Sequence, residues 1–244
     1  MVDTVVKHIF VINLDRSKSR MANYNESPPI KLTGKKIKYT RFPAVDGSKL
    51  SKKECDKMIS LWTISKKHQQ NKMGIFLSHM KLLRHIVKKR LNGTLILEDD
   101  ADLRNVKIPK KTAKLDGICF FGGWATSNKV KDQHLPLRFN PIYKGDNKPV
   151  INTIDKDNYR IIQARAYYIP NWKIARELVN FIDGYERVRA VDIMFERFPK
   201  TKYFLFPAVS TNRVGAGSTR DVTAKNMDDL LYYVDKKQMK NLIV

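Results

Sequence analysis

Cysteine is scarce in this chain, which has only Cys55 and Cys119 among its 244 residues. The two lie far apart without a CxxC spacing, which argues against a disulfide framework or a structural zinc site and fits a reducing compartment. Long apolar runs are missing as well, since no stretch approaches the roughly 20 residues that span a bilayer. The first residues show no signal-peptide pattern. We therefore expect a soluble, cytoplasmic protein.

Acidic residues are also few: 24 Asp and Glu stand against 47 Lys and Arg, a formal net charge of +23. Such a charge attracts polyanions, including nucleic acids, anionic membrane surfaces and phosphorylated substrates. The lysines are spread along the chain, however, without an arginine-rich arm, zinc-finger spacing or aromatic RNA-binding motif. We interpret most of them as solvated surface residues. Nucleic-acid binding is the alternative, and peripheral contact with an anionic membrane stays open.

The order of the apolar segments indicates an α/β protein. The chain is 42% hydrophobic and 10% aromatic, as in folded globular proteins. Strand-like runs occur at residues 8–14, 37–42, 95–97, 118–121, 161–169 and 203–206. Helical patterns are expected after residue 15, after Ser51, which forms a capping-box signature with Glu54, and at residues 74–92, 172–182 and 191–198. This alternation predicts a mostly parallel central sheet flanked by helices.

We expect one domain over residues 1–218 and a helical tail over residues 219–244. Residues from about 127 to 160 are polar, contain prolines and have weak periodicity, which predicts a long loop excursion. In the tail, Met227, Leu230, Leu231 and Val234 would share one face of a helix.

The most informative stretch is an acidic run directly after the apolar residues 95–97. Four carboxylates crowd into five positions, namely Glu98, Asp99, Asp100 and Asp102. Carboxylates this close repel one another and raise one another's pKa. A hard divalent cation with oxygen ligands, Mn²⁺ or Mg²⁺, would relieve the repulsion and indicates chemistry on a phosphate-bearing substrate. The alternative is a solvated acidic turn.

Parallel α/β sheets bind ligands where the carboxyl ends of the strands meet. The segments 13–20, 44–47 and 98–102 each follow a predicted strand, so we expect all three at this edge of the sheet. Their polar residues then form a single candidate site.

Four segments together resemble glycosyltransferase family 25, which includes bacterial lipooligosaccharide galactosyltransferases and procollagen galactosyltransferases. They are residues 10–16 (FVINLDR), 44–47 (AVDG), 74–79 (GIFLSH) and 95–100 (LILEDD), in the family's order and at its spacing. Residues 166–169 (AYYI), 191–192 (VD) and 206–209 (FPAV) resemble weaker downstream signatures. The resemblance covers about the first 210 residues.

The resemblance implies a GT-A-like, Rossmann-type nucleotide-sugar-binding fold and inverting transfer of a hexose, galactose or glucose, from a UDP-sugar. The acceptor would be a hydroxyl of a glycan or protein, as in glycan and lipopolysaccharide biosynthesis, and Mn²⁺ the usual metal. The residue chemistry agrees, because a departing diphosphate needs a divalent ion and basic side chains to stabilise its charge.

The resemblance also suggests roles for single residues. Asp100 is the first candidate for the metal, with Glu98 behind it, while Asp99 would contact the metal or the donor ribose. Asp102 forms an Asp-x-Asp pair with Asp100 and is a lower candidate for the metal, because the family's pattern does not require an acid at that position. Donor contacts are expected from Asn13, Leu14, Arg16, Arg20, Ala44, Asp46, Ser78, His79 and Asp99. Three alternatives stay open: Asp46 as a turn residue, His79 as a satisfied buried group and Arg20 as a surface arginine.

Inverting transfer needs a general base that takes the proton of the acceptor hydroxyl. Asp192 matches the family's late acidic position and is the first candidate, although a helix-capping role is the alternative. Glu196, one helical turn further on, is the reserve. Two other functions remain: a nucleic-acid-binding or metal-dependent nuclease-like protein, and a degenerate transferase fold that binds without turnover.

Overall fold

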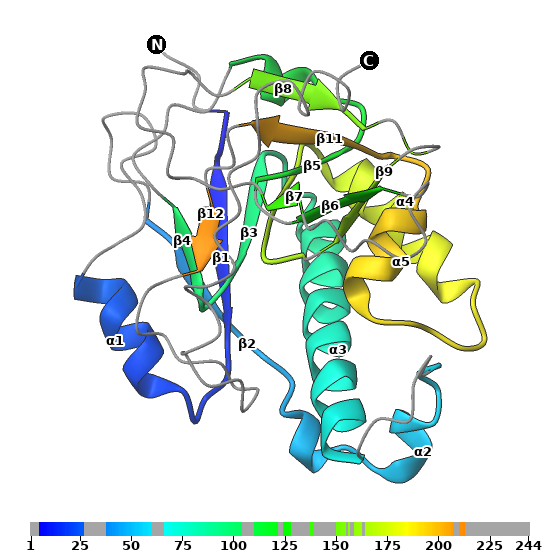
Figure 1. The fold of residues 1–244 in the computed structure, drawn as a ribbon. Coiled ribbons are helices and arrows are strands. Elements are labelled where there is room, and N and C mark those ends of the chain that lie inside the picture. Colours follow the sequence, from blue (N-terminus) through cyan, green and yellow to red (C-terminus); the bar gives the residue numbers. More distant parts are fainter. Residues whose placement is uncertain are drawn as a thin grey trace.

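The structure is a computed structural model that describes residues 5–26, 38–59, 66–103, 110–121, 124–127, 137–138, 150–154, 156, 159–162, 164–206 and 210–212. Its centre is a seven-stranded sheet in the order β2-β1-β3-β10-β5-β11-β8 (Figure 1). The strands are β1 (His8–Asn13), β2 (Thr40–Pro43), β3 (Thr94–Glu98), β5 (Ile118–Phe120), β8 (Val150–Thr153), β10 (Ala166–Ile169) and β11 (Thr201–Phe206). Strands β10 and β8 run against the other five, so the predicted mostly parallel sheet is confirmed.

Alternation along the strands divides the core into two layers, one on each face of the sheet. Phe10, Ile96 and Tyr167 belong to one layer, while their neighbours Val11 and Leu97 belong to the other. Successive side chains of a strand point to opposite faces, so apolar residues at every position indicate a sheet covered on both sides. The continuous apolar runs in β1 and β3 are the sequence signature of this burial.

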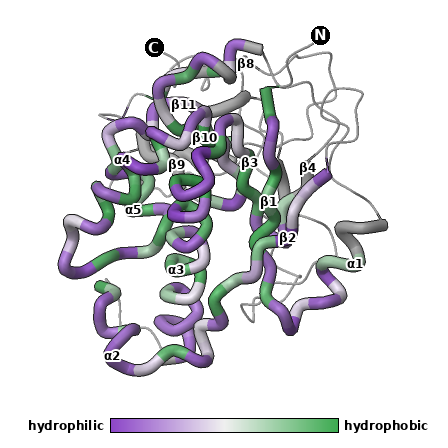
Figure 2. The backbone as a smooth tube through the Cα atoms, turned by 180° about the vertical axis from the view of Figure 1, so that it is seen from behind, coloured by the Kyte–Doolittle hydropathy of each residue, from purple (hydrophilic) through white to green (hydrophobic). Residues whose placement is uncertain are grey.

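Helices cover the two faces unequally. The larger layer contains α3 (Lys66–Lys89), α4 (Trp172–Asp183) and α5 (Val191–Arg197), whereas α1 (Lys18–Glu26) packs against the other layer through Met21. Apolar and polar residues alternate around α3 (Figure 2), with Leu82, Leu83 and Ile86 buried and Lys81 exposed. This amphipathic pattern places one side of α3 against the sheet.

The remaining elements are short. The 3₁₀ helices are η1 (Gly47–Lys49) and η2 (Lys110–Lys114). One small sheet consists of β4 (Ala101–Leu103) and β12 (Ser210–Asn212). A second consists of three strands in the order β7 (Leu137–Arg138), β6 (Trp124–Ser127) and β9 (Tyr159–Ile162). Helix α2 (Lys52–Cys55) begins with the predicted capping box, in which Ser51 and Glu54 bond each other's backbone N–H groups.

Three expectations need correction. The apolar run 161–169 is two strands of different sheets, β9 and β10, because the chain leaves one sheet and enters the other around Arg165. The stretch 127–160 is not loop throughout, since β8 in it forms the edge of the central sheet. Helix α3 begins eight residues before Gly74, because its polar first turns are good helix formers without apolar periodicity. The predicted tail at 219–244 lies outside the described residues.

Among the described helices, none combines the length and the apolar character that crossing a membrane requires. Both cysteines are buried and unbridged. Burial raises the pKa of the Cys119 thiol, which keeps it protonated within β5.

Two glycines bring the loop after β2 against α3. A Cβ on Gly74 would lie 2.7 Å from the Gly47 nitrogen and 2.9 Å from the Val45 carbonyl oxygen. A Cβ on Gly47 would lie 2.1 Å from the carbonyl oxygen of Gln70. Since real Cβ atoms do not approach backbone this closely, both positions require glycine. The AVDG and GIFLSH segments are thus two sides of one backbone contact.

We expect Gly74→Ala to lower the free energy of unfolding by about 1–3 kcal/mol, because the added methyl group forces the loop and the helix apart. Urea unfolding followed by circular dichroism measures the change. The matched control is Gly184→Ala at the end of α4, where φ is −71° and a Cβ would lie no closer than 3.5 Å to a neighbour. The control should be neutral or stabilising by up to about 1 kcal/mol. Equal losses in both variants would contradict the contact.

Candidate functional site

Strands β1, β2 and β3 end at one edge of the sheet, and the predicted site residues gather there. Backbone pairing sets Ile12 opposite Glu98 and Asn13 opposite Pro43. The Ala44 N–H also donates to the Asn13 carbonyl oxygen at 3.0 Å. The loops that follow the three strands are therefore neighbours, as expected for the carboxyl ends of parallel strands.

Asp99 is held from two sides. The Asn13 amide donates to one carboxylate oxygen at 2.7 Å, and the Arg20 guanidinium donates to the other at 2.6 Å. The side chains of Arg20 and Asp99 are only 13% and 11% exposed, so this ion pair is largely shielded from water. Removing one partner would leave a buried charge uncompensated, which is costly. The bonds fix the acidic loop to both β1 and α1.

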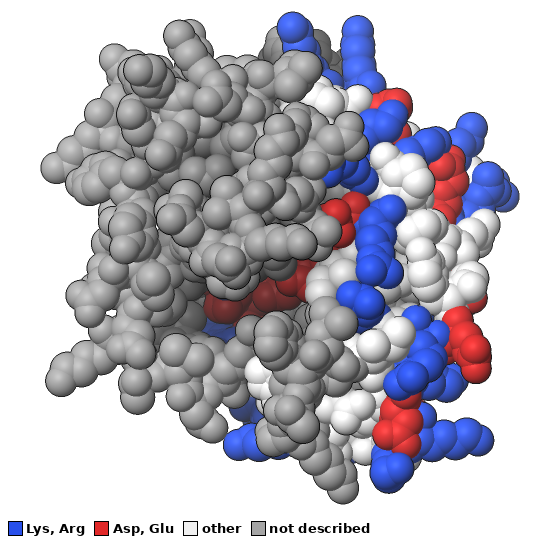
Figure 3. Space-filling view, turned by 45° about the vertical axis from the view of Figure 1, so that its right-hand side comes forward, with Lys and Arg blue, Asp and Glu red and all other residues white. Residues whose placement is uncertain are grey.

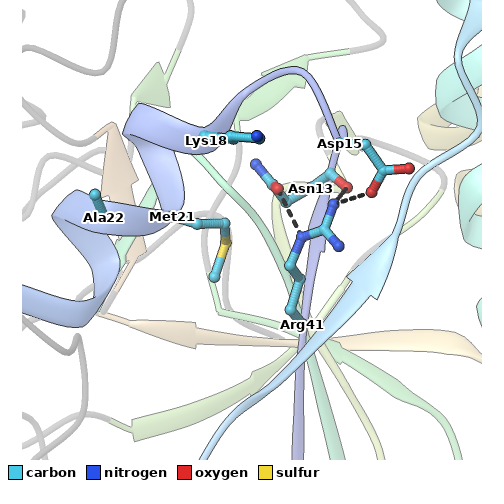
Figure 4. A pocket seen from close by; sticks show the side chains of 6 residues that line it. All are labelled: Asn13, Asp15, Lys18, Met21, Ala22 and Arg41. Carbon is cyan, nitrogen blue, oxygen red and sulfur yellow. Dashed lines mark hydrogen bonds and ion pairs between the residues drawn. The ribbon is translucent and has the colours of Figure 1, made fainter.

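A pocket of about 440 Å³ opens beside Asn13 (Figure 4). Its lining residues are Asn13, Asp15, Lys18, Met21, Ala22 and Arg41. Arg41 donates to the Asn13 side-chain oxygen at 2.9 Å and forms an ion pair with Asp15. The Arg41 hydrogen bond holds the pKa of Asp15 below its usual value. The pocket therefore presents two cationic groups, Lys18 and Arg41, against one carboxylate.

The loop after β2 is tied to the same edge. Arg16 forms an ion pair with Asp46, whose carboxylate also accepts from the Ser48 N–H at 3.0 Å. The Arg16 hydrogen bond lowers the pKa of Asp46 to about 2, with partial burial opposing the shift and Ser48 adding to it. Ser78 of α3 accepts from the Val45 N–H at 2.8 Å and donates to the Gly74 carbonyl at 2.6 Å. Asp46 is thus both a turn residue and the partner of a site arginine.

The Glu98 side chain points toward α3 and the larger core layer. Its carboxylate lies 3.2 Å from Nε2 of His79, and Nδ1 of the same ring lies 2.9 Å from the Tyr167 hydroxyl. His79 and Tyr167 are fully buried, whereas the Glu98 side chain is 28% exposed. The His79 ring is therefore a satisfied buried group that contacts an acidic site residue.

Asp100 is the least satisfied acid of the run. One carboxylate oxygen is buried without a hydrogen bond, as is Nε of Arg165, and the two atoms are 3.3 Å apart. Burial raises the pKa of Asp100, and the charges of Glu98 and Asp99 raise it further, while Arg165 and Arg20 oppose the rise. The buried Asp100 carboxylate therefore lies between one guanidinium, at 3.3 Å, and two negatively charged neighbours.

The described residues contain no group of three or more His, Cys, Asp or Glu side chains placed to hold a metal ion. The Asp102 side chain lies outside the description, and its backbone pairs with Thr211 between β4 and β12. The Leu14 carbonyl accepts from the Ser17 N–H at 2.9 Å, within the turn into α1. A metal at this edge would therefore need ligands beyond the described acids.

The candidate bases lie on α5. The Asp192 carboxylate accepts from the Ile193 N–H at 3.0 Å, and the Glu196 carbonyl accepts from Lys156 at 3.0 Å. Between them, Phe195 packs edge-on against the rings of His79 and Tyr167. The helix thus adjoins the Glu98 side of the site, rather than the pocket beside Asn13.

Basic side chains are spread over the described part of one face, with acidic side chains among them (Figure 3). Among the described residues, partly exposed ion pairs include Arg84 with Asp183 at 2.7 Å and Lys200 with Glu177 at 2.7 Å. This interspersed pattern is typical of a solvated surface, and it differs from the basic stripe of a nucleic-acid-binding face.

Three residues of this edge were not singled out from the sequence: Arg41, Arg165 and Tyr167. Arg41 and Arg165 had a usable signal, because each is a charged residue beside an apolar strand near the predicted edge. Tyr167 lies in the AYYI segment that resembles the family, but nothing in the sequence gave it a role, since a tyrosine in an apolar run resembles any core aromatic.

The Rossmann-like α/β sheet, with acidic and basic groups at its carboxyl edge, is consistent with the fold of a glycosyltransferase. Residues 6–195 match the sequence model of glycosyltransferase family 25, described as LPS biosynthesis protein. This match covers well over half of the chain, so the chain belongs to the family and is an enzyme that moves a sugar from a donor to a glycan acceptor. No curated protein matches the chain.

NMR titration of carboxyl carbons tests the Arg16–Asp46 pair. We expect Asp46 to titrate with a pKa of about 2 in the native protein and closer to 3.8 in Arg16→Gln. Because the folded pKa is lowered, the stabilisation by this pair is present above about pH 4 and is lost as the pH falls through about 2. An unchanged Asp46 titration in Arg16→Gln would show that the pair does not persist in solution.

Proposed function

We propose that this glycosyltransferase transfers a hexose, galactose or glucose, from a UDP-sugar to a hydroxyl of a glycan or protein acceptor. Transfer would invert the anomeric centre and depend on Mn²⁺ or Mg²⁺, within a GT-A type of nucleotide-sugar fold. The family membership supplies the class of reaction, and the edge described above supports the finer statement.

The proposal rests mainly on the buried carboxylate of Asp100 and the charges around it. Its buried carboxylate oxygen makes no hydrogen bond and has the Arg165 guanidinium at 3.3 Å as an ion-pair partner, while Glu98 and Asp99 add negative charge beside it. Buried polar atoms are almost always hydrogen-bonded in folded proteins, and a bound ion is one of the reasons for an exception. A divalent cation at the carboxyl edge would satisfy Asp100 and bind a diphosphate as well.

The acids at this edge fit a cation that shares its coordination with the substrate. Mg²⁺ commonly binds through one or two carboxylates together with substrate phosphates and waters, so three protein ligands are not required. We assign Asp100 as the principal ligand and Glu98 as the second, while Asp102 stays a candidate by its place in the sequence. Asp99, engaged by Asn13 and Arg20, organises the loop. A bound ion would neutralise charge on the leaving diphosphate.

The basic residues of the edge would complete the donor site. Lys18 and Arg41 face the pocket beside Asn13, and Arg16 and Arg20 lie on the turn before and within α1. In the transfer step, the acceptor oxygen bonds to the anomeric carbon while the bond from that carbon to the diphosphate oxygen breaks. The nucleoside diphosphate leaves with the electron pair, and its developing negative charge is stabilised by these cations.

The acceptor proton would pass to a carboxylate on α5. Asp192 remains the first candidate and Glu196 the reserve, because both lie on the helix that adjoins the Glu98 side of the site. Where the acceptor is lipid-linked, the basic surface would favour peripheral contact with an anionic membrane.

The test is release of UDP from UDP-galactose and UDP-glucose, with and without Mn²⁺. Asp100→Asn should lower the rate by at least about 100-fold, because the charge that holds the metal and the diphosphate is lost. The matched control is Asp56→Asn, an exposed acid that pairs with Lys52, for which we expect a rate within about twofold of the native protein. Calorimetry with UDP and Mn²⁺ measures donor binding separately from turnover.

Native activity that survives both EDTA and Asp100→Asn would overturn the metal assignment. Tight binding of UDP without release from either donor would indicate a transferase fold that binds but does not catalyse with these sugars. Polynucleotide binding with a steep salt dependence, and no affinity for UDP, would instead favour the nucleic-acid alternative.

A further inference from the structure

A row of three side chains runs from the core to the candidate site. The Tyr167 hydroxyl lies 2.9 Å from Nδ1 of His79, and Nε2 of His79 lies 3.2 Å from the Glu98 carboxylate. The first two residues are fully buried and the third is partly exposed at the edge of the sheet. The row therefore connects the interior of the larger core layer with the acidic run.

In the arrangement that we assign, the Tyr167 hydroxyl donates to His79, and His79 donates to Glu98. Burial raises the pKa of Tyr167 well above its usual value, and the charge of Glu98 raises it further, so the hydroxyl keeps its proton. A neutral imidazole has one donor and one acceptor nitrogen. With the Tyr167 hydroxyl donating to Nδ1, the proton of His79 resides on Nε2 and is donated to Glu98. Every group in the row is then satisfied.

Packing holds the histidine ring in place. Phe195 contacts both rings edge-on, with centroid distances of 6.1 Å to His79 and 5.0 Å to Tyr167. One residue before His79, Ser78 is bonded to the loop after β2. His79 cannot turn away from Glu98 without disturbing α3, α5 and that loop together.

Glu98 contacts different partners from Asp99 and Asp100, the two acids that follow it in the sequence. Asp99 is bonded to Asn13 and Arg20 on the α1 side, and Asp100 is paired with Arg165. The Glu98 carboxylate instead contacts the ring of His79 on the α3 side. Side chains that bind a metal or substrate are commonly oriented by hydrogen bonds from the residues behind them, and His79 lies in that place behind Glu98.

We propose that His79 is a positioning residue for sugar transfer: with its tautomer set by Tyr167, it aims the Glu98 carboxylate at the bound donor complex. This inference rests on the proposed function. Glu98 is the residue that contacts the donor complex, whereas His79 and Tyr167 hold the Glu98 carboxylate in position. Glu98 meets either the divalent ion or the sugar of the donor, and calorimetry with UDP plus Mn²⁺, compared with the UDP-sugar plus Mn²⁺, distinguishes the two.

The test is a pair of histidine variants that differ in which nitrogen they replace. An Asn side chain places its amide near the position of Nδ1, and a Gln side chain near that of Nε2. His79→Asn should lower kcat by about 10- to 100-fold, because Glu98 loses its donor, whereas His79→Gln should retain a larger share of the activity. Tyr167→Phe, which removes a single hydroxyl, should lower kcat by a smaller factor and covers the case in which His79→Asn does not fold.

A double-mutant cycle then asks whether His79 acts through Glu98. The combined variant His79→Asn/Glu98→Gln should be no slower than Glu98→Gln alone, since the support has nothing left to orient. If the factors by which the two single substitutions lower kcat multiply in the double variant, the inference is overturned. Equal activity of His79→Asn and His79→Gln would overturn it as well. The control His85→Asn lies on the same helix, with its ring against Phe10 and Phe42, and should lower Tm without lowering kcat.

A readout independent of activity separates this inference from the proposed function. Nitrogen-15 NMR should show His79 as the neutral tautomer protonated at Nε2, with shifts that move in Glu98→Gln and in Tyr167→Phe. If the native protein neither binds UDP nor releases it from donors, the proposed function fails, and the donor contact of Glu98 fails with it. A His79 ring protonated at Nδ1 would overturn the support even in an active enzyme.

Discussion

The parallel pairing of β1 with β3 is the constraint on which the candidate site depends. Because the two strands are neighbours in a common direction, Asn13 and the turn after Glu98 reach the same edge of the sheet. Alternation at the end of β3 then sends Glu98 toward α3, while Asp99 meets Arg20 from the side of α1. A one-residue shift in the register of β3 would move each of its side chains to the other face of the sheet and break both sets of contacts.

The segments that resemble the family are physical partners of one another. Gly47 and Gly74 permit a backbone contact between the loop after β2 and α3, and the hydroxyl of Ser78 closes it by accepting the Val45 N–H. The next residue of α3, His79, reaches the acidic run. The loops of the candidate site are thus anchored on a helix and a sheet, and sites built on such elements hold their side chains more precisely than sites on loops alone.

Much of this arrangement is predictable from sequence. Apolar periodicity predicted the sheet, the helices and the edge at which Asn13, Asp46 and Glu98 gather, because local patterns decide these features. The pairings across long separations were not predictable: Arg41 lies 28 residues from Asn13 and Tyr167 lies 88 residues from His79. The split between β9 and β10 was missed for a related reason, since an apolar run does not reveal that it serves two sheets.

The bond between the Asn13 amide and the Asp99 carboxylate also constrains how such an enzyme can diverge. An amide and a carboxylate joined at 2.7 Å, with the remaining oxygens taken by Arg20 and Arg41, leave neither residue able to change alone without stranding a charge or a donor. Positions 13 and 99 should therefore vary as a pair, together with the arginines, while the exposed lysines around them drift independently. The inheritance of the site is collective, even though its residues come from four separate segments of the chain.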